Sequence, residues 1–219
     1  MCTTVNIKLM TGRNAYHHGD LRNALIAAAA ELAEQGGPAA VTIRAAARAV
    51  GVTPTAAYRH FSGQEALLAA AKTYSLDQMG SVMRKRLASL PPEPDPARAA
   101  MTRIEAIGRG YVEFALSQPG LFRTAFTVDL DKSPVDFSDP DGPHQMLVKA
   151  VDDLIAQGFV GERYRVGSEV AAWSFVHGLS LLMLEGPLSR LPQHEREAVV
   201  DQAVNTFVWS FWAARDYDR

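Results

Sequence analysis

The sequence contains one cysteine, Cys2, among its 219 residues, so a disulfide within one chain is excluded. This scarcity fits a reducing cytoplasm. An apolar run of the roughly 18 residues that a membrane span requires is also missing. The most apolar window, residues 171–184, is shorter and contains His177. The first residues lack a basic start followed by an apolar block, so we predict no signal peptide, a cytoplasmic protein and no membrane partner.

Signatures of catalysis are also missing. We find no nucleophile beside a base and no paired acids, and isolated acids such as Glu105, Glu113 and Glu185 carry no recognisable spacing. An enzyme is therefore not expected.

Metal-binding patterns are equally incomplete. The adjacent His17 and His18 lack a further ligand at metal spacing. A calcium-like start at Asp129 fails because Pro134 and Pro140 stand where glycine and glutamate are required. We predict no metal and no cofactor.

Charge is unevenly distributed, although the net charge is only −2. Residues 1–61 hold six Lys or Arg against three Asp or Glu, a balance of +3, and the remainder carries −5. A basic N-terminal part on an acidic body favours contact with a polyanion.

The strongest local pattern is VTIRAAARAVGVTPTAAYRHF at residues 41–61. Apolar residues in it follow the i, i+3, i+4, i+7 spacing of one helix face, namely Ile43, Ala46, Ala47 and Val50. Thr42 is suited to cap that helix, and Gly51 to end it with a positive φ. Thr53 and Pro54 then begin a second helix, because proline lacks an N–H where none is needed. This second helix is short and rich in hydrogen-bond donors, so the pair predicts a helix-turn-helix.

The remaining sequence shows helical periods only. A first helix is predicted from Asp20 to the glycines at 36 and 37, and a long one begins at a capping box formed by Ser62 and Glu65. Further helices are predicted over residues 96–117, 121–126, 145–158, 165–185 and 195–215, with a surface loop at 129–143. The helix at 165–185 is apolar nearly all round and is expected to be buried. We find no strand pattern or repeat and predict an all-α fold.

Several of these segments together resemble the TetR family of one-component transcriptional regulators. They are YHHGDLRNALI at 16–26, TIRAAARAVGVTPTAAYRHF at 42–61 and QEALLAAA at 64–71. Trp173, His177 and Gly178 are similar to the Trp-x-x-x-His-Gly signature of one subgroup. The sequence departs from the family at Gln64, where lysine is usual, so a phosphate contact there would be a neutral hydrogen bond.

The resemblance implies a homodimer with distinct domains. Residues 1–15 would form a flexible arm and residues 16–62 a three-helix DNA-binding head with a helix-turn-helix. Residues 63–219 would form the effector-binding and dimerisation domain, including a long fourth helix at 63–89 that joins it to the head.

The resemblance also implies which residues bind double-stranded DNA. We expect Thr42, Tyr58, His60 and Gln64 to contact phosphates, and Arg44, Thr55, Ala56 and Arg59 to face base edges, with Thr53 at the start of the recognition helix. Arg13, Tyr16, His17 and His18 would contact the DNA backbone or minor groove as an arm. Arg48 and Arg59 also fit ordinary solvated helix charges, and Tyr58 also fits a partly core position.

One recognition helix reads only a few base pairs, so a palindromic operator and two copies are expected. The C-terminal helix has an apolar stripe that would need a partner. The predicted dimer interface comprises Val200, Val204, Phe207, Val208, Phe211 and Trp212.

A cavity for a small, mostly apolar or aromatic effector is the remaining implication. Its candidate lining is Tyr111, Phe114, Phe122, Phe126, Trp173 and His177. Aromatics at helical spacing equally fit a plain core, and His177 could find its polar partner in the backbone or in Trp173. The sequence thus predicts a repressor released by a ligand. The alternatives are a regulator controlled by a protein partner and a helical interaction module without DNA.

Overall fold

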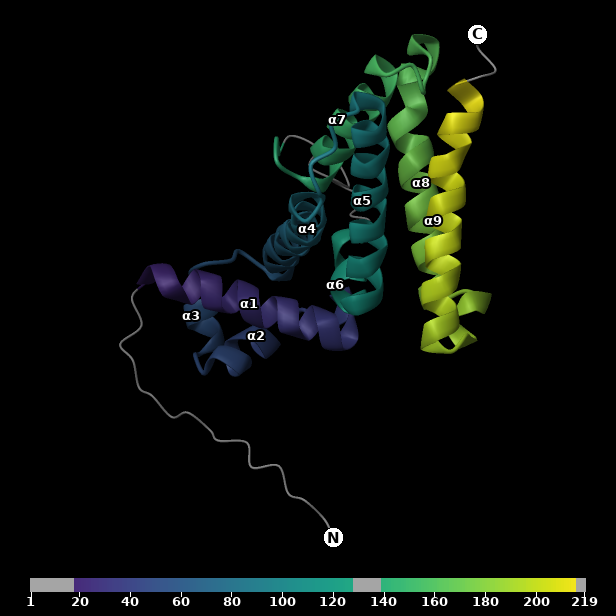
Figure 1. Cartoon of the computed structure of the whole chain (residues 1–219). Helices are drawn as coiled ribbons and strands as arrows, with labels where there is room; N and C mark the ends of the chain where they lie inside the picture. Colours follow the sequence, from purple (N-terminus) through teal and green to yellow (C-terminus); the bar gives the residue numbers. More distant parts are fainter. Residues whose placement is uncertain (1–17, 128–138, 216–219) are drawn as a thin grey trace.

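The computed structural model describes residues 18–127 and 139–215. Every regular element in those two ranges is helical, as the sequence predicts (Figure 1). Arg13, Tyr16 and His17, the predicted arm, lie outside the described residues, as does the calcium-like start at Asp129.

Three helices form a small N-terminal head, residues 18–62. They are α1 (His18–Gly36), α2 (Ile43–Val50) and α3 (Pro54–Tyr58), with the short 3-10 helix η1 (Pro38–Ala40) between the first two. Helix α1 begins two residues before its predicted start. Leu25, Val41 and Phe61 fill the centre of the head together with small alanines. Because alanine side chains are small, the three helices approach one another closely.

The long helix α4 (Gln64–Ala88) leaves the head and continues into the rest of the molecule, the body. Its predicted start is wrong in one respect. The N-cap is Gly63, without a side-chain cap, and Ser62 lies one residue outside the helix. Glu65 is therefore in the first turn but too early to complete a capping box.

The body contains five further α-helices within the described residues. They are α5 (Pro96–Ser117), α6 (Pro119–Ala125), α7 (Pro143–Ala156), α8 (Arg165–Leu184) and α9 (Gln193–Arg215), with 3-10 turns η2 (Glu162–Tyr164) and η3 (Pro187–Arg190). Helices α8 and α9 each pack against α5, and Phe175 of α8 stacks on Phe207 of α9 (Figure 1). Arg109 on α5 reaches α9, where it forms an ion pair with Asp201 and donates to Oδ1 of Asn205 at 2.9 Å.

Helix α8 is more exposed to solvent than the sequence predicts. Val170 is 61% exposed and Leu182 is 45% exposed, so the prediction of a buried helix is wrong for the single chain. The helix is also kinked near its start, at Gly167, which has φ +95°. An apolar sequence alone does not say whether a helix is covered by its own chain or by another molecule.

Head and body meet tightly where α1 ends beside the start of α6. A Cβ placed on Gly120 would overlap backbone atoms of Ala33 and Glu34, so only glycine fits. The Oε2 of Glu34 accepts the backbone N–H of Leu121 at 2.9 Å. This bond satisfies one of the N–H groups that a helix start leaves without an internal partner.

Candidate functional site

The two helices α2 and α3 are shaped by the predicted caps. The hydroxyl of Thr42 accepts from the backbone N–H of Ala45 at 3.1 Å, and that of Thr53 from Ala56 at 3.2 Å. Gly51 ends α2 with φ +79° in the left-handed region. The caps fix a sharp turn that leaves the outer face of α3 free of the head's core.

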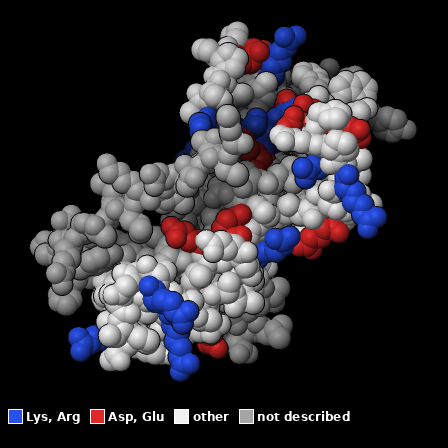
Figure 2. All heavy atoms as spheres, turned by 90° about the horizontal axis from the view of Figure 1, so that it is seen from below, with Lys and Arg blue, Asp and Glu red and all other residues white. Residues whose placement is uncertain are grey.

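The predicted base-reading and phosphate-binding residues are distributed over α2, α3 and the start of α4. Tyr58 is 53% exposed, so the core interpretation of this residue is not supported. Thr42, Ala56 and His60 are half-buried, and the other predicted contacts are exposed: Arg44, Thr53, Thr55, Arg59 and Gln64. Figure 2, seen from below, shows basic side chains projecting from the head. The arrangement presents donors and positive charge to a polyanion.

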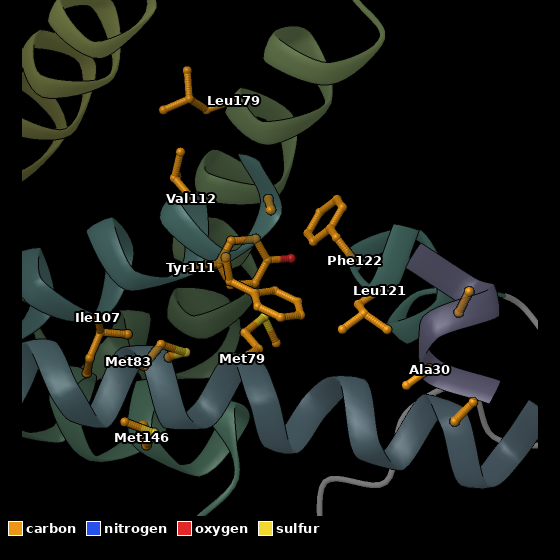
Figure 3. Packing of buried hydrophobic residues seen from close by; sticks show 14 of the residues in the cluster. Ala30, Met79, Met83, Ile107, Tyr111, Val112, Leu121, Phe122, Met146 and Leu179 are labelled. Atoms are coloured by element: carbon orange, nitrogen blue, oxygen red, sulfur yellow. The ribbon is translucent and has the colours of Figure 1, made fainter. Parts of the chain in front are cut away.

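A cavity of about 140 Å³ lies in the body. Its walls come from α4, α5, α8, α9 and the start of α7, together with Phe126 at the end of α6. The lining includes Met79 and Met83 from α4, Ile107 from α5 and Val176 from α8. Figure 3 shows the two methionines on α4 with Tyr111 above them. The lining is mainly apolar, as in most small-molecule sites.

A hydrogen-bonded chain of three side chains borders the cavity. Nε1 of Trp173 donates to the hydroxyl of Tyr111 at 3.1 Å, and that hydroxyl lies 2.8 Å from Nδ1 of His177. With the indole N–H donated to its oxygen, the Tyr111 hydroxyl keeps its own proton for donation to Nδ1 in the His177 tautomer that carries hydrogen on Nε2. Burial lowers the pKa of His177, and burial likewise raises the pKa of Tyr111. Both groups are therefore neutral near pH 7, which suits this bonding pattern.

The six predicted effector residues separate into three groups. Tyr111, Phe126 and Trp173 line the cavity directly. Phe122 and His177 pack behind them, with Phe122–Phe126 ring centroids 5.1 Å apart and Phe126–His177 centroids 4.9 Å apart. Phe114 is fully buried and is not part of the lining, so it belongs to the core. The polar partner of His177 is Tyr111, not the backbone or Trp173.

Sequence reasoning missed the polar side of the cavity. Asp77 on α4, Asp139 before α7 and His144 on α7 belong to the lining. Asp77 and Asp139 are exposed, so this part of the lining is in contact with solvent. We call these two residues the acidic rim. Their positions 62 residues apart in the sequence gave no signal, because only the packing of α7 on α4 unites them.

The predicted dimer residues on α9 pack mostly inside their own chain. Val204 and Val208 are buried and line the cavity, so they are not available as surface contacts. Phe207 stacks on Phe175 with centroids 4.2 Å apart, and Trp212 packs on Phe159 at 4.8 Å. The half-buried members are Val200, Phe207, Phe211 and Trp212. The large exposed residue on α9 is instead Trp209, at 67%.

The isolated acids of the body serve as structural ion-pair partners. Glu105 pairs with Arg109, Glu113 with Arg86 and Glu185 with Arg123. Across residues 18–127 and 139–215, no helix combines the length and the apolarity that crossing a bilayer requires.

Two family models match the chain. Residues 104–207 match one described as "Tetracyclin repressor-like, C-terminal domain", and residues 25–71 match "Bacterial regulatory proteins, tetR family". Together they cover about two thirds of the chain. The first spans the cavity walls on α5 and α8, and the second spans the helix-turn-helix.

Individual relatives agree with these models. An uncharacterised HTH-type transcriptional regulator of Bacillus subtilis (strain 168), YobS, is 24% identical over 166 residues, 76% of this chain and 80% of the relative. A protein of unknown function from Rhodococcus sp. RHA1 has a TM-score of 0.70 at 25% identity, covering 90% of this chain and 96% of that one. A TetR from Acinetobacter baumannii AYE has a TM-score of 0.59 at 23% identity, covering 94% and 99%.

The helix-turn-helix head, the helical body and both family models define a DNA-binding transcriptional regulator. The chain belongs to the TetR family. This is a family of bacterial regulatory proteins.

Proposed function

We propose that this protein is a homodimeric repressor that a small, mostly apolar or aromatic effector releases from a palindromic operator. The observation that carries the ligand-responsive part is the course of α4. Its first residue, Gln64, follows the recognition helix closely, and Leu76, Met79 and Met83 on the same helix line the cavity. One rigid element thus touches both the DNA-binding head and the ligand space.

A second connection supports the same coupling. Phe126 at the end of α6 lines the cavity, and Gly120 at its beginning packs directly on α1 of the head. A ligand that prefers one position of α4 and α6 would shift the population of head positions. Only a difference in ligand affinity between the two states can produce this shift.

Most of the described head residues that we propose as DNA contacts are exposed. Arg44 and Arg59 would read base edges with Thr55 and Ala56, and Tyr58 would bind phosphate. The remaining proposed contacts are Thr42, Thr53, His60 and Gln64, with Arg13, Tyr16 and His17 as an arm. Trp173, His177 and Gly178 support assignment to the subgroup with the Trp-x-x-x-His-Gly signature.

The proposed dimer interface combines the outward faces of α8 and α9. Exposed apolar side chains gather on these two helices, with Val170, Leu181 and Leu182 on α8 and Trp209 on α9. Large exposed apolar surfaces on a single chain indicate a partner. Phe207, Phe211 and Trp212 would support this face from beneath, and Val200 would contribute at its edge.

Equilibrium sedimentation tests the dimer. We expect a dimer at micromolar concentration and a monomer for Trp209→Asp, with Tyr164→Asp as a control on an exposed aromatic outside α8 and α9. A wild-type monomer at that concentration would contradict the proposal.

Effector control is tested with a compound screen by thermal unfolding, because a ligand that binds only the folded state raises Tm. We expect hits among small apolar or aromatic compounds, and these hits should lower operator affinity. Gly108→Met should weaken them, because Gly108 lines the cavity. A screen in which only strongly charged metabolites raise Tm would overturn the effector class, and the absence of any hit would favour control by a protein partner.

A further inference from the structure

The charged side chains in the described cavity lining are both acids, and both are exposed to solvent. They are Asp77 and Asp139, the acidic rim. The same lining contains the aromatic rings of Tyr111, Phe126 and Trp173. A molecule in this cavity therefore meets both apolar rings and two carboxylates.

Two nearby cations in the described part of the chain donate hydrogen bonds to backbone carbonyl oxygens and form no ion pair with the acidic rim. Arg84 donates from Nη1 to the carbonyl oxygen of Asp141 at 2.9 Å, and Lys149 donates from Nζ to that of Pro140 at 3.1 Å. Among the described residues, neither carboxylate of the rim forms an ion pair. Within the described residues, the carboxylate of Asp139 accepts the backbone N–H of Asp141 at 3.0 Å.

The two carboxylates also affect each other. Burial raises the pKa of Asp77, and the negative charge of Asp139 raises it further, whereas Arg84 acts in the opposite direction. The rim therefore holds negative charge that a ligand cation would stabilise, while an anionic ligand would be repelled.

Cavity size limits the apolar part of the ligand. A volume of about 140 Å³ is close to the engineered cavity of about 150 Å³ that binds benzene. One six-membered aromatic ring therefore fits within the apolar walls, and a short chain would bring a polar group to the rim.

We propose that the effector is a small aromatic amine, with its ring between Tyr111, Phe126 and Trp173 and its protonated amine at Asp77 and Asp139. This inference rests on the proposed ligand-responsive function and names the chemistry of that same site. A protonated amine supplies three donors and one positive charge to two acceptor-only carboxylates.

Three probes of similar shape test the inference on the full-length protein. They are 2-phenylethylamine, 2-phenylethanol and phenylacetate, with binding measured by calorimetry near pH 7. We expect the amine to bind about tenfold or more tightly than the alcohol, as an added charge pair near a protein surface allows. Phenylacetate should bind weakest.

Variants of Asp77 and Asp139 then test whether these two residues cause the preference for the amine. Asp77→Asn and Asp139→Asn together should reduce the amine-to-alcohol preference to about twofold or less without changing alcohol affinity. Asp141→Asn is the matched control, because this neighbouring carboxylate is exposed and outside the cavity lining. It should retain the preference for the amine.

The possible results distinguish an error in the ligand's amine group from an error in the ligand cavity itself. Equal affinity for amine and alcohol would overturn the amine and leave the ligand cavity in place. An amine preference that survives both rim substitutions would overturn the role of Asp77 and Asp139. Failure of all three probes to bind would overturn the inference and also count against a ligand-responsive cavity.

Discussion

The hydroxyl of Tyr111 on α5 lies 2.8 Å from Nδ1 of His177 on α8, and it simultaneously accepts from the indole of Trp173. One phenol oxygen thus satisfies two partly buried polar rings that come from another helix. The rings of Trp173 and His177 are therefore both held by a residue on a different helix.

Tyr111→Phe should destabilise the protein by about 1–3 kcal/mol, because it removes the hydroxyl to which the partly buried rings of His177 and Trp173 are hydrogen-bonded. Urea unfolding measures the change. Tyr164→Phe is the control, since Tyr164 is 55% exposed and its hydroxyl has little to lose. Equal stability of wild type and Tyr111→Phe would contradict the structural role of this bond.

Stability should fall as the pH decreases below about 6.5, the ordinary value for histidine. Burial lowers the pKa of His177, and it also lowers that of His144 against the opposing charge of Glu169. Below 6.5 the unfolded chain binds protons that the folded chain excludes, so the stabilisation is complete above 6.5 and is lost on acidification. His177→Gln should show a smaller loss than wild type in urea unfolding at pH 7.5, 6.5 and 5.5. Identical pH profiles would show that His177 does not contribute.

Gly120→Ala should destabilise the chain by about 1–3 kcal/mol, because the added methyl meets backbone that cannot yield. It should also alter operator affinity, since the affected contact joins α6 to α1. Gly108→Ala is the matched control, as its added Cβ would lie 3.5 Å from Cγ1 of Val176, an ordinary contact. The control should be neutral or up to about 1 kcal/mol more stable. Thermal unfolding measures the stability of both variants. Equal stabilities would contradict the close contact between Gly120 and α1.

Tyr58→Phe should weaken binding to all DNA sequences alike, because a phosphate contact carries no sequence information. Arg44→Ala should lower affinity and relax preference at particular base pairs, by about 1–3 kcal/mol for a bidentate contact. Fluorescence anisotropy at several salt concentrations measures both effects. Lys85→Ala, on the exposed far end of α4, is the control. An unchanged sequence preference in Arg44→Ala would exclude base reading by this residue.

The local features of the head could be predicted from the sequence because they depend on residues close together in the chain. Thr42 and Thr53 cap their helices through a contact three residues away, and Gly51 supplies a positive φ that few other residues adopt. The capping box at Ser62 was wrong, although its pattern was present, because the N-cap is one residue later, at Gly63, and the helix begins at Gln64. Capping residues in a sequence therefore predict where a helix begins only to within one or two residues.

The cavity could be predicted only in part because it depends on contacts between distant segments. Tyr111, Phe126 and Trp173 were predicted as apolar lining, whereas Phe114, with the same character, is core. Asp77 and Asp139 become neighbours through the packing of α7 beside α4. Burial on α8 and α9 was also misjudged, since helical periodicity gives the apolar face but not whether this chain or a second copy covers it.

Selection of bound duplexes from a random pool tests the central claim most directly. The full-length protein is incubated with the pool at one stated salt concentration, because phosphate contacts make affinity strongly salt-dependent. Bound DNA is recovered through several rounds and sequenced. We predict a palindrome whose half-sites lie about one helical turn apart, as two symmetrically placed recognition helices require. If the folded protein enriches no sequence, or enriches a single half-site without a symmetric partner, the proposal of a dimeric operator-binding regulator is contradicted.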